Sequence, residues 1–356
     1  MNIIKKRKFA ILKNEDPFDH HLWVNACEAY GNSIDYRIID ITAENWLKAI
    51  KDYSPDMLLL KPSGKTSLFR ALYQERLEIL TGVFNYKSCP SISEVRIYEN
   101  KRYFAYWAEA NEIPHPQTFV FYKKKEALSA LGTFSLPLVG KINIGASGKG
   151  VRVLYTRDDV KKYINQAFDK GLISRTGPKL QPGKLFQRVW QKIKHPNHLL
   201  NRLKTYKDIA ADRQLGFVIL QQYIPHDYEW RVVRIGNSYF AHKKMVLNGK
   251  ASGSLLKEYA DPPKDLLDFI HVFTDKFGFT CVAIDLFEPT LGTYLINEIQ
   301  CIFGQSDPHQ MIVDGKPGRY LFQEGHWVFE EGAFNTNESF DLRVKTAMEL
   351  YVSGSI

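Results

Sequence analysis

The chain has 356 residues, 44% of them hydrophobic, which is enough apolar surface for a globular protein of two or three subdomains. Its 48 Lys and Arg exceed its 39 Asp and Glu, giving a formal net charge of +9. No run approaches the roughly 18 to 20 apolar residues of a membrane span. The apolar stretch in the basic start MNIIKKRKFAILKNED is too short for a signal peptide. We therefore expect a cytoplasmic protein.

The first hundred residues alternate between strand-like and helix-like patterns. Apolar runs at 8–13, 35–41 and 56–61 are strand candidates, and the segments 18–31, 42–53 and 66–80 between and after them are helix candidates. This alternation predicts a parallel sheet with helices on its faces. KPSGKTS at 61–67 imitates the end of a P-loop, but position 59 is Leu where that loop needs Gly. We interpret it as a strand-to-helix turn rather than a nucleotide-binding loop.

After residue 100 the pattern changes. Pro114-His115-Pro116 restricts the backbone and is typical of an extended connector. From about residue 214 strand-like runs dominate, which predicts a mostly antiparallel sheet, with 264–278 as an amphipathic helix. The four cysteines, Cys27, Cys89, Cys281 and Cys301, have no CxxC spacing, so we expect buried thiols rather than disulfides or zinc ligands.

Positive charge is concentrated between Lys179 and Arg213, where nine Lys or Arg stand against two Asp. This basic segment mixes charged and apolar residues. It is a solvated amphipathic insertion, a contact for an anionic surface such as an acidic polymer or a membrane face, or a lid ordered by ATP.

The stretch LVGKINIGASGKGVRVL at 138–154 places a lysine on a strand before a glycine loop and a second strand. It matches neither a Walker loop nor a Rossmann fingerprint. A glycine hairpin of this kind can close backbone donors and Lys149 over phosphates while Lys141 holds them from below. An ordinary glycine-rich hairpin is the alternative.

Acidic and amide side chains end two later strands. Glu298 and Gln300 lie two residues apart, so strand alternation puts them on one face. With Asp285 from a neighbouring strand they offer oxygen ligands suited to Mg²⁺. An ordinary strand-end carboxylate is the alternative for each acid taken alone.

The order of the motifs over about 100–306 resembles that of the ATP-grasp superfamily. These motifs are a strand lysine, a glycine flap, the segment VILQQYI, the Glu229-Trp230-Arg231 step, Asp285 and a Glu-x-amide pair. The similarity is to its carboxylate–amine ligases, including the ribosomal-protein glutamate ligase and glutathione synthetase group. Two positions depart from the pattern. Gln222 replaces the usual hinge glutamate, and Gln300 replaces the usual asparagine while still supplying an amide oxygen.

The resemblance implies residue roles. It implies ATP contacts from two lysine segments, the glycine loop, the hinge and a ribose contact: Lys101, Lys141, Gly145, Ser147, Gly148, Lys149, Gly150, Gln222, Tyr223, Ile224 and Asp227. Arg231, Lys141 and Lys244 would be catalytic. Two Mg²⁺ ions, for which Mn²⁺ can substitute, would be held by Asp285, Glu298 and Gln300. Arg234, Lys243 and Lys244 are candidates for an anionic substrate, whereas His242 is interpreted as a structural strand histidine.

The resemblance also implies an α/β (α+β) fold of three domains. These are a Rossmann-like N-terminal domain at 1–98, a small β-rich flap domain at 99–220 with a basic insertion at about 171–213, and a C-terminal, mostly antiparallel domain at 221–356 that carries the metal site. ATP would lie between the last two.

The activity that the resemblance implies is ATP-dependent ligation of a carboxylate to an amine through an acyl phosphate, with ADP and phosphate released. The partners would be small or polymer-linked carboxylates and amines, including acidic saccharides; no specific nucleic acid is predicted. Two alternatives stay open: a phosphotransferase acting on a hydroxyl, and a non-catalytic nucleotide-binding module.

Overall fold

The computed structural model describes residues 6–62, 66–145, 150–173, 208–209, 211–247, 250–251, 256–303 and 307–353. Its internal contacts divide the chain into two units. Unit 1 comprises Met1–Ser63, Leu68–Pro116 and Ile224–Ile356, and unit 2 comprises Gly64–Ser67 and Gln117–Tyr223. Most of the basic segment lies outside the described residues. The three-domain division stays a prediction.

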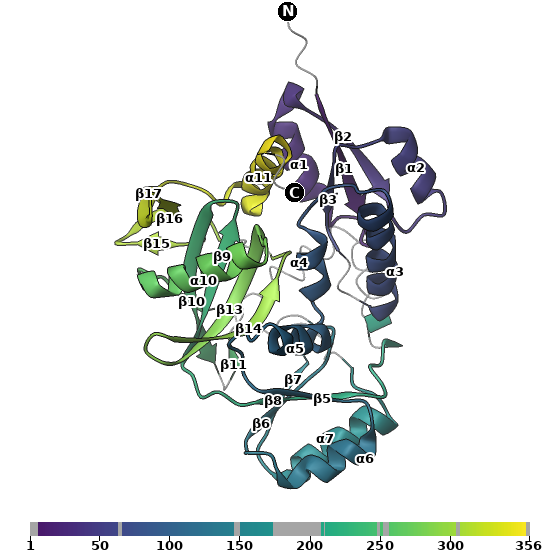
Figure 1. Ribbon diagram of the computed structural model, residues 1–356, viewed down its shortest axis with the longest axis vertical. Coiled ribbons are helices and arrows are strands. Elements are labelled where there is room, and N and C mark those ends of the chain that lie inside the picture. The colour runs from purple at the N-terminus through teal and green to yellow at the C-terminus, as the bar shows by residue number, and fades with distance from the viewer. Residues whose placement is uncertain are drawn as a thin grey trace, which may run out of the picture. The chain divides into compact units, whose positions relative to one another are not determined.

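Unit 1 begins with the predicted parallel sheet, whose order is β2-β1-β3-β4 (Figure 1). Its elements are β1 (Arg7–Lys13), α1 (His21–Ala29), β2 (Ile34–Asp40), α2 (Trp46–Tyr53), β3 (Met57–Leu60), α3 (Ser67–Glu78), a π-helical turn (Ile79–Val83), β4 (Ser88–Cys89), α4 (Ile92–Ile97) and α5 (Lys101–Ala110), with a short 3-10 turn at Gly31–Ser33. The central residues of β1 and all of β3 are buried. They are buried because helices cover both faces of such a sheet, and continuous apolar runs suit that environment.

A nine-stranded antiparallel sheet forms the rest of unit 1, with the main order β14-β13-β9-β10-β16-β15. Its elements are β9 (Tyr228–Ile235), β10 (Ser238–Leu247), β11 (Lys250–Ala251), β12 (Lys257–Glu258), α10 (Lys264–Lys276), β13 (Cys281–Thr290), β14 (Thr293–Gln300), β15 (Ile312–Val313), β16 (Lys316–Gln323), β17 (His326–Glu331), a 3-10 turn (Thr336–Ser339) and α11 (Phe340–Ser353). Both the antiparallel sheet and the helix expected at 264–278 are confirmed.

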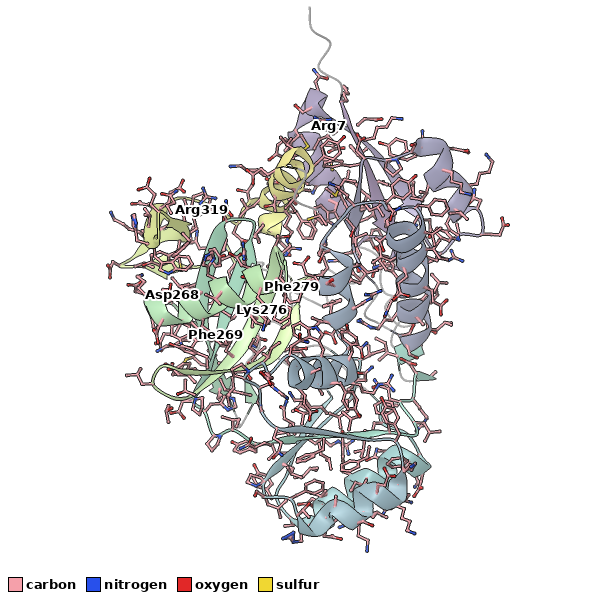
Figure 2. All side chains as sticks on the ribbon, viewed as in Figure 1. Arg7, Asp268, Phe269, Lys276, Phe279 and Arg319 are labelled. Carbon is pink, nitrogen blue, oxygen red and sulfur yellow. The ribbon has the colours of Figure 1, made fainter. Side chains whose placement is uncertain are left out.

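Helix α10 covers one face of this sheet. Its buried Leu266, Ile270 and Phe273 pack with Trp230 and Leu286 in the largest core cluster of unit 1. Phe279 belongs to this cluster and Phe269 packs against it; both are labelled in Figure 2. The opposite face of the sheet is therefore the one available for polar side chains.

The parallel and antiparallel sheets are tied together by the buried carboxylate of Glu94. This residue completes a capping box with Ser91 at the start of α4. Its Oε1 atom also accepts hydrogen bonds from the N–H groups of Thr280 and Cys281, at 2.9 and 2.7 Å. The start of β13 is thereby fixed relative to α4 and α5.

Unit 2 is a four-stranded antiparallel sheet of order β5-β8-β6-β7. Its elements are β5 (Thr118–Phe121), α6 (Lys124–Ser129), a 3-10 turn (Ala130–Gly132), β6 (Leu138–Lys141), β7 (Val151–Leu154), α7 (Arg157–Asp169) and β8 (Val218–Gln222). Tyr163 of α7 packs so closely on Gly140 that a Cβ atom there would lie 2.6 Å from its ring. Among the described residues, no helix is long and apolar enough to cross a membrane.

Candidate functional site

Four neighbouring strands bring the polar residues of unit 1 onto one sheet face. Arg231 of β9 is paired in register with His242 of β10 on one side and with Asp285 of β13 on the other. One step along β9, on the same face, Glu229 is paired with Lys244. Because side chains alternate along a strand, these residues face the same way. We call this set the β9–β13 cluster.

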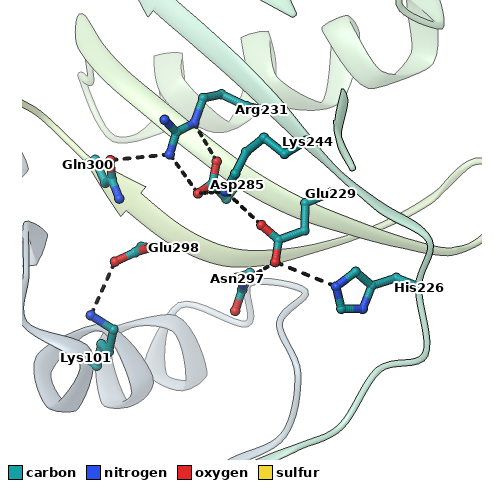
Figure 3. A network of polar contacts seen from close by, with 9 residues as sticks. All are labelled: Lys101, His226, Glu229, Arg231, Lys244, Asp285, Asn297, Glu298 and Gln300. Carbon is teal, nitrogen blue, oxygen red and sulfur yellow. Dashed lines mark hydrogen bonds and ion pairs between the residues drawn. The ribbon is translucent and has the colours of Figure 1, made fainter. Parts of the chain in front are cut away.

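Asp285 is the centre of the cluster (Figure 3). Its Oδ1 and Oδ2 atoms accept hydrogen bonds from Arg231 Nε and Nη2 at 2.8 and 2.9 Å. Lys244 Nζ donates to the same Oδ2 at 2.8 Å and to Glu229 Oε2 at 2.9 Å. Asp285, Glu229 and Lys244 are buried, with 2%, 6% and 6% of their surface exposed. Paired charges at low exposure interact strongly, because little water screens them.

The neighbours of these groups shift their proton affinities in opposite directions. Burial alone would raise the pKa of Asp285, but Arg231 and Lys244 hold that pKa well below its ordinary value. Burial would lower the pKa of Lys244, yet Asp285 and Glu229 keep it above its ordinary value. Asp285 and Lys244 are therefore both ionised throughout the neutral range.

A second group of charged residues lies at the start of α5, where Lys101 contacts Glu298 and Glu99. Asn100 caps this helix through the N–H of Tyr103, which places Lys101 in the first turn. Lys101 Nζ lies 3.3 Å from Glu298 Oε1 and 3.6 Å from Glu99 Oε2. Burial acts to lower the pKa of Lys101, but Glu298 and Glu99 raise it. Sequence reasoning assigned Lys101 to the flap domain, whereas the structure has it in unit 1 beside Glu298.

Gln300 lies on the same strand as Glu298 and contacts the β9–β13 cluster. Its Oε1 atom accepts from Arg231 Nη2 at 3.4 Å. Asp285 and Glu298 are directly paired across β13 and β14, and Ala283 is paired with Gln300. The structure therefore brings the three predicted metal ligands, Asp285, Glu298 and Gln300, to one face (Figure 3).

Two members of the site were missed from the sequence. The register between β13 and β14 shifts beside Glu298, so Asn297 also turns to this face, and its Nδ2 donates to Glu229 Oε1 at 3.3 Å. His226 Nδ1 donates to the Ile224 carbonyl at 2.6 Å, which directs Nε2 toward Glu229 Oε1, 3.8 Å away. A bulge depends on long-range pairing, so local alternation gives no signal for it.

Lys257 was also missed. Lys257 lies on β12, where it is paired in register with Lys244 of β10, and its Nζ donates to Asp307 Oδ2 at 2.6 Å. Burial lowers the pKa of Lys257, with Asp307 opposing the effect. His242 is buried beside it, and its Nδ1 donates to the Gln310 carbonyl at 3.0 Å. Burial lowers the pKa of His242 to about 3, so the ring is neutral at neutral pH.

Arg234 and Lys243 lie on the other face of the sheet. Lys243 Nζ stands 4.3 Å from the ring centre of Tyr228 and 5.4 Å from that of Trp230. Arg234 binds Thr274 and Asp275 of α10. The expectation that they share an anion site with Lys244 is wrong, because Lys243 and Lys244 are consecutive on a strand and therefore point to opposite faces.

In unit 2, Lys141 ends β6 as a buried residue, 8% exposed. The following turn is held by Gln214, whose Oε1 accepts from the N–H groups of Asn143 and Ile144 at 2.6 and 3.2 Å, and whose Nε2 donates to the Ile144 carbonyl at 2.9 Å. Of the predicted glycine-loop residues, Gly145 and Gly150 flank the loop, while Ser147, Gly148 and Lys149 lie outside the described residues. Their roles stay predictions.

The predicted hinge follows β8. The N–H of Gln222 donates to the Gln117 carbonyl at 2.8 Å, and its side-chain Oε1 accepts from the Gln117 N–H at 3.4 Å. The backbone donor of Gln222 is thus already used within unit 2. Tyr223 is the last residue of unit 2, whereas Ile224 and Asp227 belong to unit 1. Asp227 is exposed and its carbonyl accepts from Val246.

Carboxylate and amide oxygens are the ligands that Mg²⁺ prefers, so the donors of Asp285, Glu298 and Gln300 suit this ion. Both oxygens of Asp285 already accept hydrogen bonds from cations. Over the described part of the chain, no three His, Cys, Asp or Glu side chains form a group that could hold a metal. The metal assignment therefore stays a prediction, and binding would require Asp285 to exchange hydrogen bonds for the ion.

Sequence comparisons find no matching family model and no matching curated protein. Solved structures do match. D-alanine–D-alanine ligase from Bacillus anthracis, complexed with ATP, superposes with a TM-score of 0.51 at 11% identity, over 98% of this chain and 99% of the other. An ADP complex of N5-carboxyaminoimidazole ribonucleotide synthetase gives 0.53 at 15% identity, over 86% and 73%.

A biotin carboxylase domain from Hydrogenobacter thermophilus, in complex with MgADP and bicarbonate, gives a TM-score of 0.52 at 11% identity over 86% of this chain and 66% of the other. The chain has the ATP-grasp fold. The fold that the motif order implied is thus confirmed, although no sequence comparison detects it.

Proposed function

We propose that this ATP-grasp protein is an ATP-dependent ligase that activates a carboxylate as an acyl phosphate and joins it to an amine. One observation carries the proposal. The β9–β13 cluster places Arg231 and Lys244 beside Asp285, and Lys101 of α5 lies beside Glu298 of β14, in a fold that ATP- and ADP-bound enzymes share.

Activation is needed because a carboxylate is a poor electrophile with a poor leaving group. In the first step a carboxylate oxygen forms a bond to the γ-phosphorus, and the bond from that phosphorus to the bridging oxygen of ADP breaks. In the second step the amine nitrogen bonds to the acyl carbon, inorganic phosphate leaves with the bonding electrons, and the nitrogen loses a proton. ATP, acid and amine are thereby converted to amide, ADP and phosphate.

The β9–β13 cluster and the neighbouring Lys101, Glu298 and Gln300 carry the positive charges and oxygen ligands that this reaction needs. Phosphoryl transfer relies on positioning and on neutralising negative charge rather than on covalent help from the protein. Arg231, Lys244 and Lys101 would bind phosphate oxygens, and Asp285, Glu298 and Gln300 would hold Mg²⁺, which adds positive charge when bound. We include Lys141 and the loop around Gly145 and Gly150 in the proposal as further phosphate contacts. The adenine contacts expected of Gln222, Tyr223 and Ile224 complete it.

Hydroxylamine trapping tests the proposal. The protein is incubated with ATP, Mg²⁺ and pools of amino acids, sugar acids and other small carboxylic acids, and ADP and hydroxamate are measured together. We expect one acid to give equal amounts of both, and Glu298→Ala to remove both signals. ADP without any hydroxamate would contradict carboxylate activation and would favour transfer to a hydroxyl. Nucleotide binding with no turnover over the whole panel would favour a non-catalytic module.

A further inference from the structure

The parallel sheet of unit 1 has a topological switch point that the proposed chemistry does not use. In the order β2-β1-β3-β4, the chain leaves β1 toward β2 on one side, whereas it leaves β3 toward β4 on the other. In open α/β sheets, ligands bind where connections diverge in this way, at the carboxyl ends of the two central strands. Those strands are β1 and β3, which Asn14 and Lys61 directly follow.

Hydrogen bonds fix the backbone of Lys61 at this point. Asn14, itself 2% exposed, donates from Nδ2 to the Lys61 carbonyl at 2.9 Å and so links the two strand ends. The N–H of Lys61 donates to the Tyr73 hydroxyl at 3.2 Å. The side chain of Lys61 consequently starts from a fixed position at the switch point.

Lys61 is partly buried, and its ammonium group has no ion-pair partner among the described residues. Among the described residues, no carboxylate oxygen lies within 4.0 Å of its Nζ, which instead stands 5.6 Å from the ring centre of Phe340 on α11. Burial lowers the pKa of Lys61, and Arg343 adds to this effect, whereas Asp19 and, more weakly, Glu338 and Asp16 oppose it.

A second cation lies behind the same ring. Arg343 is fully buried, with its guanidinium 4.4 Å from the ring centre of Phe340 and 4.2 Å from that of Phe303. Its Nη2 donates to the Phe303 carbonyl at 3.1 Å, but Nε and Nη1 are buried without a hydrogen-bond partner in the described structure. Arg70 of α3, 7% exposed, likewise has a buried Nη1 without one.

Buried cations are normally paired, because removing a charge from water without a counter-charge is unfavourable. Here the partly buried Lys61 and the fully buried Arg343 both lie near the ring of Phe340, at the place where the sheet topology favours a ligand. Asp16, Asp19 and Glu338 lie close enough to act on Lys61, and they would repel an anion of high charge. A singly charged anion therefore suits the position better than a phosphate dianion.

We propose that the carboxylate group of a small molecule binds at the carboxyl ends of β1 and β3, with Lys61 as its direct contact and Arg343 providing positive charge behind it. The inference rests on the proposed function in one respect: the bound molecule would be one of the two ligase substrates, held by a carboxylate that does not react. That substrate would then be an amino acid or another molecule with a second acidic group.

Binding is tested without nucleotide, so that its outcome is independent of ATP turnover. Thermal unfolding and calorimetry are run with acetate, dicarboxylic acids, amino acids and inorganic phosphate at constant ionic strength. At about five times the Kd of a bound acid, the melting temperature should rise by about 2 °C. Lys61→Met should remove this rise and weaken binding at least tenfold. Lys345→Met, which changes an exposed lysine of α11 paired with Glu349, is the control and should keep the response.

A second readout separates a ligand contact from a structural cation. Without added acid, Lys61→Met should unfold at a higher temperature than the wild type, because it removes a partly buried charge whose pKa burial lowers and that has no ion-pair partner among the described residues. The proposal would be wrong if Lys61→Met unfolded earlier or failed to fold, if it kept the wild-type response, if no carboxylate stabilised the wild type, or if phosphate bound at Lys61 more tightly than every carboxylate. Loss of ATP turnover with intact Lys61-dependent binding would instead contradict only the proposed function.

Discussion

Arg231 holds Asp285 with two parallel hydrogen bonds, from Nε to Oδ1 at 2.8 Å and from Nη2 to Oδ2 at 2.9 Å. This bidentate arrangement is the strongest geometry available to an arginine–carboxylate pair. Lys244 shares the same carboxylate at 2.8 Å. One acid therefore neutralises part of the charge on a buried lysine and on a partly buried arginine.

Asp285→Asn should strongly destabilise the protein. The substitution leaves Arg231 without its paired charge and Lys244 with Glu229 alone, and breaking a buried ion pair in this way costs about 3 to 5 kcal/mol. Urea unfolding measures the change. Asp52→Asn removes an exposed acid that pairs with Lys48 and should change the free energy of unfolding by less than about 0.5 kcal/mol. Equal effects of the two substitutions would contradict the buried network.

Asp285 should also make stability depend on acid pH. Its pKa is depressed in the folded state, so the unfolded chain binds the proton more readily and the stabilisation is present above the ordinary pKa of 3.8. That stabilisation is lost as the pH falls from about 4 through the depressed pKa. Unfolding free energies measured between pH 5 and 2 should therefore fall more steeply for the wild type than for Asp285→Asn. Parallel curves would show that Asp285 is not held by its cations.

His242 should act in a different pH window. Its folded pKa of about 3 lies below the ordinary 6.5, so the unfolded chain takes up a proton first as the pH falls. Between pH 6.5 and 3 the wild type should lose up to about 1.4 kcal/mol per pH unit from this group. His242→Asn keeps a donor for the Gln310 carbonyl and removes the titration. The variant should lack that part of the slope in urea unfolding, and an unchanged slope would contradict a buried neutral ring.

The turn after Lys141 depends on one buried amide. Gln214→Leu leaves the N–H groups of Asn143 and Ile144 and the Ile144 carbonyl without their partner. Unsatisfied buried groups cost about 1 to 3 kcal/mol each, so the loss should exceed about 2 kcal/mol. Gln166→Leu, which removes only a bond to the Arg152 side chain, is a control in the same unit. Hydrogen exchange near Asn143 should increase in Gln214→Leu alone; exchange that is unchanged would show that the amide does not hold the turn.

Local patterns in the sequence predicted much of the fold. Buried apolar runs separated by amphipathic segments gave the parallel sheet, and alternation put Glu298 and Gln300 on one face. Boundaries were less accurate. The helix expected from Thr42 begins at Trp46, because the N–H and hydroxyl of Thr42 bind Asp40 in a turn. Because the Asp40 side chain holds Thr42 in this turn, the helix begins four residues later than the sequence pattern predicted.

The candidate site was only partly predictable. Arg231 and Asp285 are 54 residues apart, and their pairing depends on the register between β9 and β13, which no local pattern specifies. Alternation along a strand places Lys243 and Lys244 on opposite faces of the sheet, but it does not show which of the two lysines faces the β9–β13 cluster. The two lysines were therefore equivalent candidates in the sequence. The bulge beside Glu298, which turns Asn297 to the same face, has the same long-range origin.

These two neighbouring lysines allow the most direct test of the central claim, that the β9–β13 cluster is the ATP-using site. Mg²⁺-dependent ADP release is measured with the acid panel for the wild type, Lys244→Met and Lys243→Met. Lys244→Met should lower the rate by about 10²- to 10³-fold, as expected for a lost charge-stabilising donor. Lys243→Met, on the opposite face against Tyr228 and Trp230, should stay within about twofold. Equal rates for the two variants would contradict the account.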